Sequence, residues 1–271
     1  MKPTDLCALM LCTLPIVLVG CAAATSAPPP APSSTPVPTT TLRPTATSRP
    51  ITLQFIGNSC TVIIAPDGTR IVSDPYGDSA HPIGIGPLPN DLVGDAVTVS
   101  HAHPDHNNVK GVGGTPQLIT APGTFQIGMV KVTGYGGYEG SPSGPSKNPH
   151  VVFVFEIGGV KIVHLGDSGP ITRPDVLAAI EQADVLLANI DGYVIPADQI
   201  VPFIQRAKVR TFVPTHYSLS TRTRWQGAPT IDEFIKTLPA DLPIVRQGSE
   251  IPVTPNMPTQ LVELTSLALI K

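Results

Sequence analysis

Six consecutive residues, His101-Ala102-His103-Pro104-Asp105-His106, decide how the rest of this chain is interpreted. They place three imidazoles and one carboxylate directly after the apolar segment 95–100. Alternation along an extended chain lets His101 and His103 point to the same side, and the rest of the motif falls beyond a turn at Pro104. Imidazole nitrogens and carboxylate oxygens are ligands that divalent metals prefer. The pattern predicts a metal site at the end of a strand, and a plain histidine-rich surface loop is the less favoured alternative.

Short apolar or alternating runs on both sides of the motif predict one domain over residues 51–271. The runs 51–56, 61–65 and 70–74 are separated by turn residues and predict a β-meander. Further strands are predicted at 95–100, 117–120, 129–133, 151–157, 160–165, 185–190 and 209–214, and helices at 174–183, 197–207 and 230–238. Because strands alternate with helices in the second half, we expect sheets packed face to face with helices outside.

The first fifty residues predict a targeting segment and a tether. Leu6–Val19 carries no charge and is too short for a comfortable transmembrane helix, which is typical of a signal peptide. It runs into Leu18-Val19-Gly20-Cys21, which resembles the lipobox of bacterial lipoproteins, and an ordinary signal peptide with an incidental cysteine is the alternative. Residues 21–50 are rich in Pro, Ser, Thr and Ala and predict an extended linker. We therefore expect cleavage after residue 20, lipidation of Cys21, and an extracytoplasmic domain anchored to a bacterial membrane.

Composition excludes several other classes of protein. Charged residues make up only 14% of the chain and the formal net charge is −3, so no basic surface for a nucleic acid is expected. A hydrophobic content of 41% argues against disorder over the whole length. Three of the four cysteines lie in the first 21 residues, which excludes a disulfide framework. The expected partners are a small-molecule substrate and the membrane, and the oligomeric state stays open.

Three motifs in this order resemble the metallo-β-lactamase superfamily over nearly all of residues 51–271. The first is the His-x-His-x-Asp-His motif after a strand, the second is the Gly166-Asp167 turn, and the third is the strand that ends at His216. The subgroup that the chain resembles most contains small Zn-dependent hydrolases similar to the L-ascorbate-6-phosphate lactonase. The resemblance implies a four-layer αββα sandwich with two metal ions at the open edge of its sheets.

The resemblance also implies which residues hold the metals. Six positions match ligands of the family: His101, His103, Asp105, His106, Asp167 and His216. The first two belong to the first metal, the next two and His216 belong to the second, and Asp167 bridges both. A water shared by two divalent ions loses its proton near neutral pH, so the implied reaction is hydrolysis of an ester, lactone or phosphoester. Asp105 and Asp167 are the implied catalytic residues, and zinc is the expected metal.

One position departs from the family pattern. The first metal normally has a third histidine, and counting from the strand at 129–133 places Glu139 there. A glutamate can bind a metal directly and would favour harder ions such as Mn or Fe, while a weakened or lost first site is the open alternative. His150, the nearest other histidine, is expected to begin a strand rather than to bind metal.

The leading interpretation is thus a membrane-tethered dinuclear metallohydrolase. A catalytically impaired binding or scaffold protein on the same fold is the alternative, since one ligand position differs. An iron-dependent oxidoreductase is a third class, which His103 disfavours because the clearest iron type has glutamate there.

Several other residues carry weaker expectations. Asp74 is expected to orient His101 or His103, and His164 to be a buried structural residue. Tyr135 and Tyr138, in a glycine-rich loop, are expected to form a wall of the substrate pocket. Two arginines that follow His216 are either ligands for an anionic substrate or solvated loop residues: Arg222 and Arg224.

Overall fold

The structure is a computed structural model, and it describes residues 49–77, 85–140, 148–220, 224 and 227–268. The predicted signal peptide, Cys21 and nearly all of the linker lie outside these residues, so the expectations for them stay predictions. Within the described part of the chain, no helix has both the length and the apolar character needed to cross a membrane.

The first sheet has six strands, in the spatial order β13-β1-β2-β3-β4-β5. Their bounds are β1 Ile51–Gly57, β2 Cys60–Ile64, β3 Arg70–Ser73, β4 Ala96–Thr98, β5 Gln117–Ile119 and β13 Glu250–Val253. The first three strands form the predicted antiparallel meander, and β3, β4 and β5 run parallel. Strand β13, which we did not predict, returns from the C-terminal part of the chain and pairs antiparallel with β1.

The second sheet has eight strands, in the order β12-β14-β11-β10-β9-β8-β7-β6. Their bounds are β6 Gly123–Ile127, β7 Val130–Tyr138, β8 Pro149–Ile157, β9 Val160–His164, β10 Val185–Asn189, β11 Thr211–Thr215, β12 Ile244–Gln247 and β14 Gln260–Leu264. Strands β6 to β9 are joined antiparallel, whereas β9, β10, β11, β14 and β12 are parallel neighbours. In the antiparallel half, consecutive strands are neighbours, as in the first three strands of the first sheet. In the parallel half, helices connect the successive strands β9, β10, β11 and β12.

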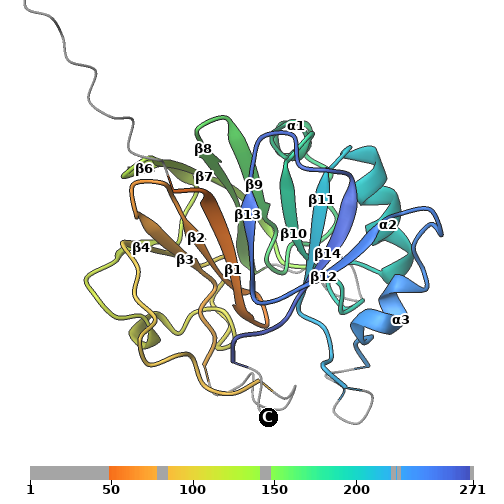
Figure 1. The fold of residues 1–271 in the computed structure, drawn as a ribbon, viewed down its shortest axis with the longest axis horizontal. Coiled ribbons are helices and arrows are strands. Elements are labelled where there is room, and N and C mark those ends of the chain that lie inside the picture. The colour runs from red at the N-terminus through yellow and green to blue at the C-terminus, as the bar shows by residue number, and fades with distance from the viewer. Residues whose placement is uncertain (1–48, 78–84, 141–147, 221–223, 225–226, 269–271) are drawn as a thin grey trace, which may run out of the picture. The chain divides into compact units, whose positions relative to one another are not determined.

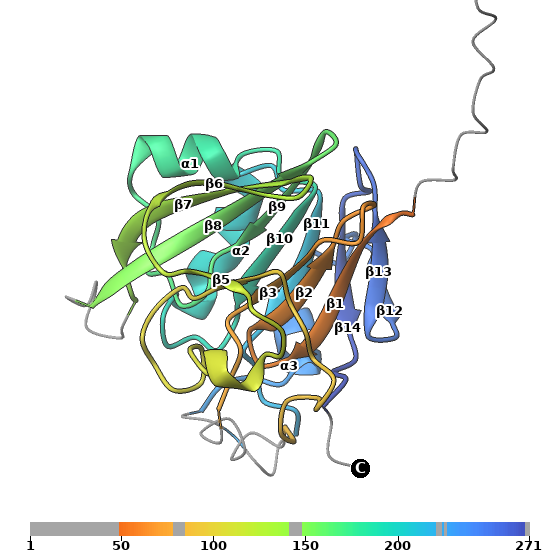
Figure 2. The same cartoon turned by 90° about the vertical axis from the view of Figure 1, so that its left-hand side faces the viewer.

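The two sheets lie face to face around a continuous apolar core (Figure 1 and Figure 2). Leu53 of β1 and Phe153 and Phe155 of β8 are among its buried members. Helices α1 (Pro174–Ile180), α2 (Ala197–Arg206) and α3 (Ile231–Ile235) pack on the outer face of the eight-stranded sheet. Thr230 caps α3 through a reciprocal capping box with Glu233, as its position before the apolar stripe predicts. The predicted sandwich of two sheets with outer helices is confirmed.

The outer face of the six-stranded sheet is covered in a different way. Ile85, Leu92 and Val112 of the segment before and after the histidine motif pack on this face. In the described residues of that segment, the only helix is the short 3-10 turn η2 (Val109–Gly111). This outer layer is therefore mostly loop, and the histidine motif is part of that loop, directly after β4.

The topology brings the polar residues of both sheets to one edge. Asp74 follows β3 and the histidine motif follows β4, and these two strands are parallel. Asp167, Asp191 and His216 follow β9, β10 and β11, which are parallel in the other sheet. Because the carboxyl ends of parallel strands meet at the same edge, residues far apart in sequence converge there.

The turn between β9 and Asp167 requires a glycine. Gly166 has φ of 53°, in the left-handed region, and a Cβ built there would lie less than 3.0 Å from Ser100 Oγ and from His150 Nε2. The backbone next to Asp167 thus packs directly on the residue that precedes the histidine motif. This close approach fixes the two halves of the edge against each other.

Gly166→Ala is expected to cost about 3 kcal/mol or more of the free energy of unfolding, because it adds overpacking to left-handed strain. Gly158→Ala is the matched control, since Gly158 has φ of 56° and nothing within 4 Å of its Cβ position. Only the left-handed strain remains there, about 1 kcal/mol. Urea unfolding of both variants measures the difference, and equal losses would show that the close approach at Gly166 carries no energetic weight.

Candidate metal centre

The histidine motif gathers its imidazoles into one cluster after β4. The ring centroids of His101 and His103 are 4.6 Å apart, and those of His101 and His106 are 4.3 Å apart. His101 and His106 are buried, while His103 is exposed and Asp105 is half-buried. The structure therefore brings all four predicted ligands of the motif to the edge of the sheets, with one side of the cluster open to solvent.

One group of possible ligand atoms, at the position of the second metal of the family, forms around Asp105. Its Oδ2 lies 3.2 Å from His216 Nε2 and 3.5 Å from His106 Nε2. These three atoms all lie within 4.8 Å of one another, close enough to hold one cation. His216 reaches this place from the end of β11 with φ of 55°, and its N–H donates to the Asn58 carbonyl at 3.0 Å.

Another group, at the position of the first metal of the family, contains the residue that departs from the family pattern. Glu139 Oε1 lies 3.4 Å from His103 Nδ1, and both atoms lie within 4.8 Å of a ring nitrogen of His101. The Glu139 side chain is buried, and its other oxygen accepts a hydrogen bond of 2.8 Å from Asn148 Nδ2. Glu139 therefore faces the cluster and is not a solvated loop residue.

Asp167 lies between the two groups. Its Oδ2 is 3.8 Å from His101 Nε2, 3.4 Å from His106 Nε2 and 4.0 Å from His216 Nε2. Its Oδ1 accepts a hydrogen bond of 2.8 Å from Asn189 Nδ2, which keeps Oδ2 directed at the histidines. This is the arrangement that the resemblance implies for a bridging carboxylate.

Mutual charge shifts the pKa values of the cluster in opposite directions. Burial by itself raises the pKa of Asp167, but the charges of His106 and His216 outweigh it and hold that pKa well below its usual range. Burial lowers the pKa of His216, but Asp167, Asp105 and Asp191 together raise it to about 10. Burial and the nearby His106 lower the pKa of His101 to about 4. The Asp167 carboxylate is thus ionised at neutral pH, as a metal ligand must be.

Two buried nitrogen atoms support a cation at this place. His101 Nε2 and His106 Nε2 have no hydrogen-bond partner among the described residues, although both are buried. Buried polar atoms without partners are costly, and each of these faces a carboxylate oxygen without a hydrogen bond to it. A cation among these atoms would satisfy both nitrogens and neutralise the carboxylates. The donor set of imidazole and carboxylate fits Zn, Mn or Fe.

The far side of the histidine rings is held by two aspartates. His106 Nδ1 lies 2.9 Å from Asp74 Oδ2, and His216 Nδ1 lies 3.3 Å from Asp191 Oδ2. His101 Nδ1 contacts Ser100 Oγ at 3.0 Å, and that hydroxyl in turn donates to Asp74. A carboxylate at Nδ1 keeps the hydrogen on that nitrogen and leaves Nε2 free to bind a metal.

These contacts refine the expectations for the surrounding residues. Asp74 contacts His106 directly and reaches His101 through Ser100, and the sequence pointed only to His101 or His103. Asp191 was missed, although its place just after a buried strand that ends in Asn189 was a usable signal. His164 is structural, as predicted, because its Nε2 donates to the Ser59 carbonyl and its Nδ1 accepts from the Gly166 N–H.

The remaining candidates lie away from the cluster or outside the described residues. His150 begins β8 as predicted, with its ring 5.5 Å from that of His101 and in none of the ligand groups. Arg224 pairs with Glu233 of α3, and Arg222 lies outside the described residues.

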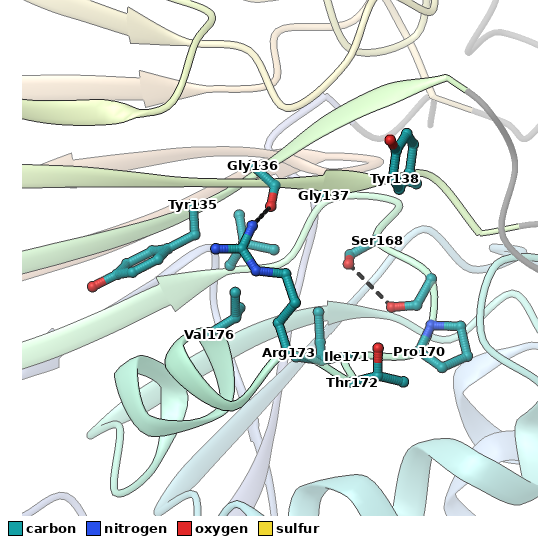
Figure 3. Close-up of a pocket in the computed structure, with 12 residues that line it drawn as sticks. Tyr135, Gly136, Gly137, Tyr138, Ser168, Pro170, Ile171, Thr172, Arg173 and Val176 are labelled. Carbon is teal, nitrogen blue, oxygen red and sulfur yellow. Dashed lines mark hydrogen bonds between the residues drawn. The ribbon is translucent and has the colours of Figure 1, made fainter.

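The two tyrosines line a pocket of about 230 Å³ beside the centre. Figure 3 shows Tyr135 at the left and Tyr138 at the upper right of the lining residues, with Ser168 below Tyr138 and with Arg173 donating to the Gly136 carbonyl. The segment up to Tyr138 is part of strand β7 and not the loop that its glycines suggested. The tyrosines therefore form a pocket wall from a rigid element, as the strand pairing with β8 requires.

Curated and solved proteins resemble this chain over most of its length. A UPF0173 metal-dependent hydrolase of Natranaerobius thermophilus is 25% identical over 209 residues, which covers 68% of this chain and 89% of that protein. A UPF0173 metal-dependent hydrolase of Cupriavidus taiwanensis is 26% identical over 232 residues, which covers 69% of this chain and 80% of that protein.

A solved structure is similar as well. The crystal structure of a putative Zn-dependent hydrolase of the metallo-β-lactamase superfamily from Thermotoga maritima superposes with a TM-score of 0.64 at 26% identity. It covers 79% of this chain and 98% of that one. The family described as "Beta-lactamase superfamily domain" matches residues 52–216. Because this match spans the strands of the metal centre and every candidate ligand from His101 to His216, the chain belongs to the β-lactamase superfamily.

Proposed function

We propose that this protein is a metal-dependent hydrolase that uses two divalent ions to cleave an ester, lactone or phosphoester bond of a small molecule. The observation that carries the proposal is the position of Asp167 Oδ2, within 4.0 Å of the Nε2 atoms of His101, His106 and His216. The names of the relatives, metal-dependent and Zn-dependent hydrolases, support the same class of reaction. When bound, such a pair of ions lowers the pKa of a water and withdraws electrons from the oxygen of the scissile group.

The protein's own residues hold the centre and move the proton. We assign the bridging position to Asp167, the first site to His101, His103 and Glu139, and the second to Asp105, His106 and His216. The Asp105 side chain is 20% exposed, against 8% for Asp167 and 6% for Glu139. The Asp105 carboxylate is therefore the one most open to a substrate, and we assign to it the transfer of the proton from the attacking water to the leaving group.

The two sites offer the same kinds of ligand atom. The second offers two imidazoles and one carboxylate, a set that suits zinc. The first offers the same set through Glu139, where the family has a third histidine, so we propose zinc there with Mn or Fe as accepted substitutes. The resemblance to the L-ascorbate-6-phosphate lactonase group stays a prediction about the substrate.

We also propose that the domain is held outside the cytoplasm by a lipid on Cys21, because Leu18-Val19-Gly20-Cys21 resembles a lipobox and a Pro-rich linker follows it. A chain expressed in bacteria fed with labelled palmitate is expected to carry the label and to sediment with membranes. Cys21→Ser is expected to lose both properties. A label that persists in this variant would contradict lipidation at Cys21, and Cys60→Ser is the control that should change neither property.

The metal content of the zinc-reconstituted protein tests the hydrolase. Two ions per chain by mass spectrometry are expected, together with hydrolysis of p-nitrophenyl acetate that a chelator abolishes. Glu139→Ala is expected to lose one ion, while Glu139→His keeps both because an imidazole replaces the carboxylate as ligand. Glu156→Ala, at an exposed glutamate of β8, is the control and should keep two ions. One zinc ion or none in the unaltered chain would favour the impaired binding protein, and a single iron in the protein as purified would favour the oxidoreductase.

Asp191→Asn tests the hydrogen-bond polarity at His216. Asp191 Oδ1 accepts from the N–H groups of Tyr193 and Val194, so an asparagine oxygen would stay there and turn its amide towards His216 Nδ1. That amide donates, which moves the imidazole hydrogen to Nε2 and blocks the metal-binding atom. We expect one of the two ions to bind about tenfold to a hundredfold more weakly.

The matched control is Asp175→Asn, which changes an exposed aspartate of α1. Competition with a zinc-binding dye measures both variants, and urea unfolding of the metal-free proteins checks that the fold is kept. Unchanged affinity in Asp191→Asn would mean that Asp191 does not set the tautomer of His216.

A further inference from the structure

A cavity of about 720 Å³ opens beside the metal centre, between the histidine motif and the ends of β5, β7 and β8. His101 and Ala102 of the motif form part of its lining, together with Leu118, Pro122 and Gly136. The tyrosine pocket of Figure 3 is smaller, and its lining includes none of the candidate metal ligands. The larger cavity is therefore the one that a substrate bound at the first site would enter.

The lining of this cavity carries no charged aspartate, glutamate, lysine or arginine, as far as the structure describes the chain. Most of its side chains are small or apolar, among them Val109, Leu118, Ala121 and Pro122. Leu118 is 52% exposed and is one of the most exposed large apolar residues that the structure describes. A single exposed leucine needs no explanation, but a leucine in the apolar wall of a cavity beside a metal site indicates a binding surface.

A phosphate or carboxylate in this cavity would lack the partners that such groups require. Anions are bound by arginine or lysine side chains or by clusters of N–H groups. Arg173, which donates to the Gly136 carbonyl, pairs with Asp175, and Arg224 pairs with Glu233. A cavity wall without these charged side chains thus fits an uncharged part of a substrate.

We propose that this cavity receives the hydrocarbon part of the substrate, so that the enzyme acts on esters or lactones with an uncharged acyl or alkyl chain. The inference rests on the proposed function, since it assigns a substrate class to that same centre. His101 in the cavity wall places the scissile group at the metals while the chain extends along Leu118 and Pro122. Phosphorylated substrates, with charge at the far end of the molecule, are disfavoured by the same wall.

Alkyl hydroxamates test the cavity without turnover, because the hydroxamate group chelates metal ions and the chain length varies freely. Calorimetric titration of the zinc-loaded full-length protein with acetohydroxamate and octanohydroxamate is expected to show at least about 30-fold tighter binding of the longer chain. A fully buried methylene contributes about fourfold, so this figure corresponds to burial of fewer than half of the six added methylenes.

Leu118→Gln locates the effect in this cavity. It is expected to weaken octanohydroxamate about tenfold, through lost apolar contact, and to leave acetohydroxamate unchanged. Met129→Gln is the matched control, because Met129 is 49% exposed in the turn between β6 and β7 and lines none of the described pockets. That variant is expected to keep the full preference for the longer chain.

Each failure has a distinct meaning. Equal binding of both hydroxamates, or an unchanged preference in Leu118→Gln, overturns the cavity assignment and leaves the metal centre in place. No binding of either hydroxamate to the zinc-loaded protein contradicts the metal centre itself, and the proposed function and the cavity then fail together.

Discussion

The convergence of buried carboxylates and imidazoles on Asp167 Oδ2 is the constraint on which the rest of this structure depends. Charged groups removed from water are costly unless they are paired and hydrogen-bonded. Asp167 is compensated by Asn189 on one side and by three histidine Nε2 atoms on the other. The compensation is incomplete, because His101 Nε2 and His106 Nε2 lack hydrogen-bond partners in the described chain. The fold therefore holds these groups in a position that a cation, and not the protein alone, would stabilise.

Asp74 joins the first sheet to this cluster. It follows β3 with φ of 46°, a left-handed conformation that aspartate tolerates better than most residues. From there its carboxylate accepts from the Ser100 N–H and hydroxyl and contacts His106 Nδ1. One buried side chain thus sets the orientation of two histidine rings and the path of the backbone between β4 and the motif. Asp191 has the corresponding place in the second sheet, beside His216.

The sequence predicts the parts of this arrangement that depend on local pattern. The spacing of the motif, the meander over β1 to β3 and the helical stripe of α1 all have a clear period. Strands β6 and β12 were missed because their residues are mostly exposed or half-buried and show no apolar alternation. Asp191 was missed for another reason: its role depends on the register of β10 against β11. Asn189 pairs with Thr215, so the residues just beyond each strand, Asp191 and His216, meet. The place of Asp191 after a buried strand marks it as a candidate, but no local pattern encodes the register that brings it to His216.

The glycines of β7 show how a pattern can be noticed and still misinterpreted. Their number suggests a flexible loop, yet the segment is a strand paired with β8. A Cβ at Gly134 would lie 3.0 Å from the Ala121 carbonyl oxygen, and one at Gly136 would lie 2.9 Å from Pro122 Cγ. These two glycines therefore serve close approach, because they let the segment before β6 lie against the strand. At Gly137 a Cβ would meet nothing within 4 Å, so that position faces open space. Strand β7 separates the apolar cavity from the tyrosine pocket, and both keep their shape because this wall is a paired strand.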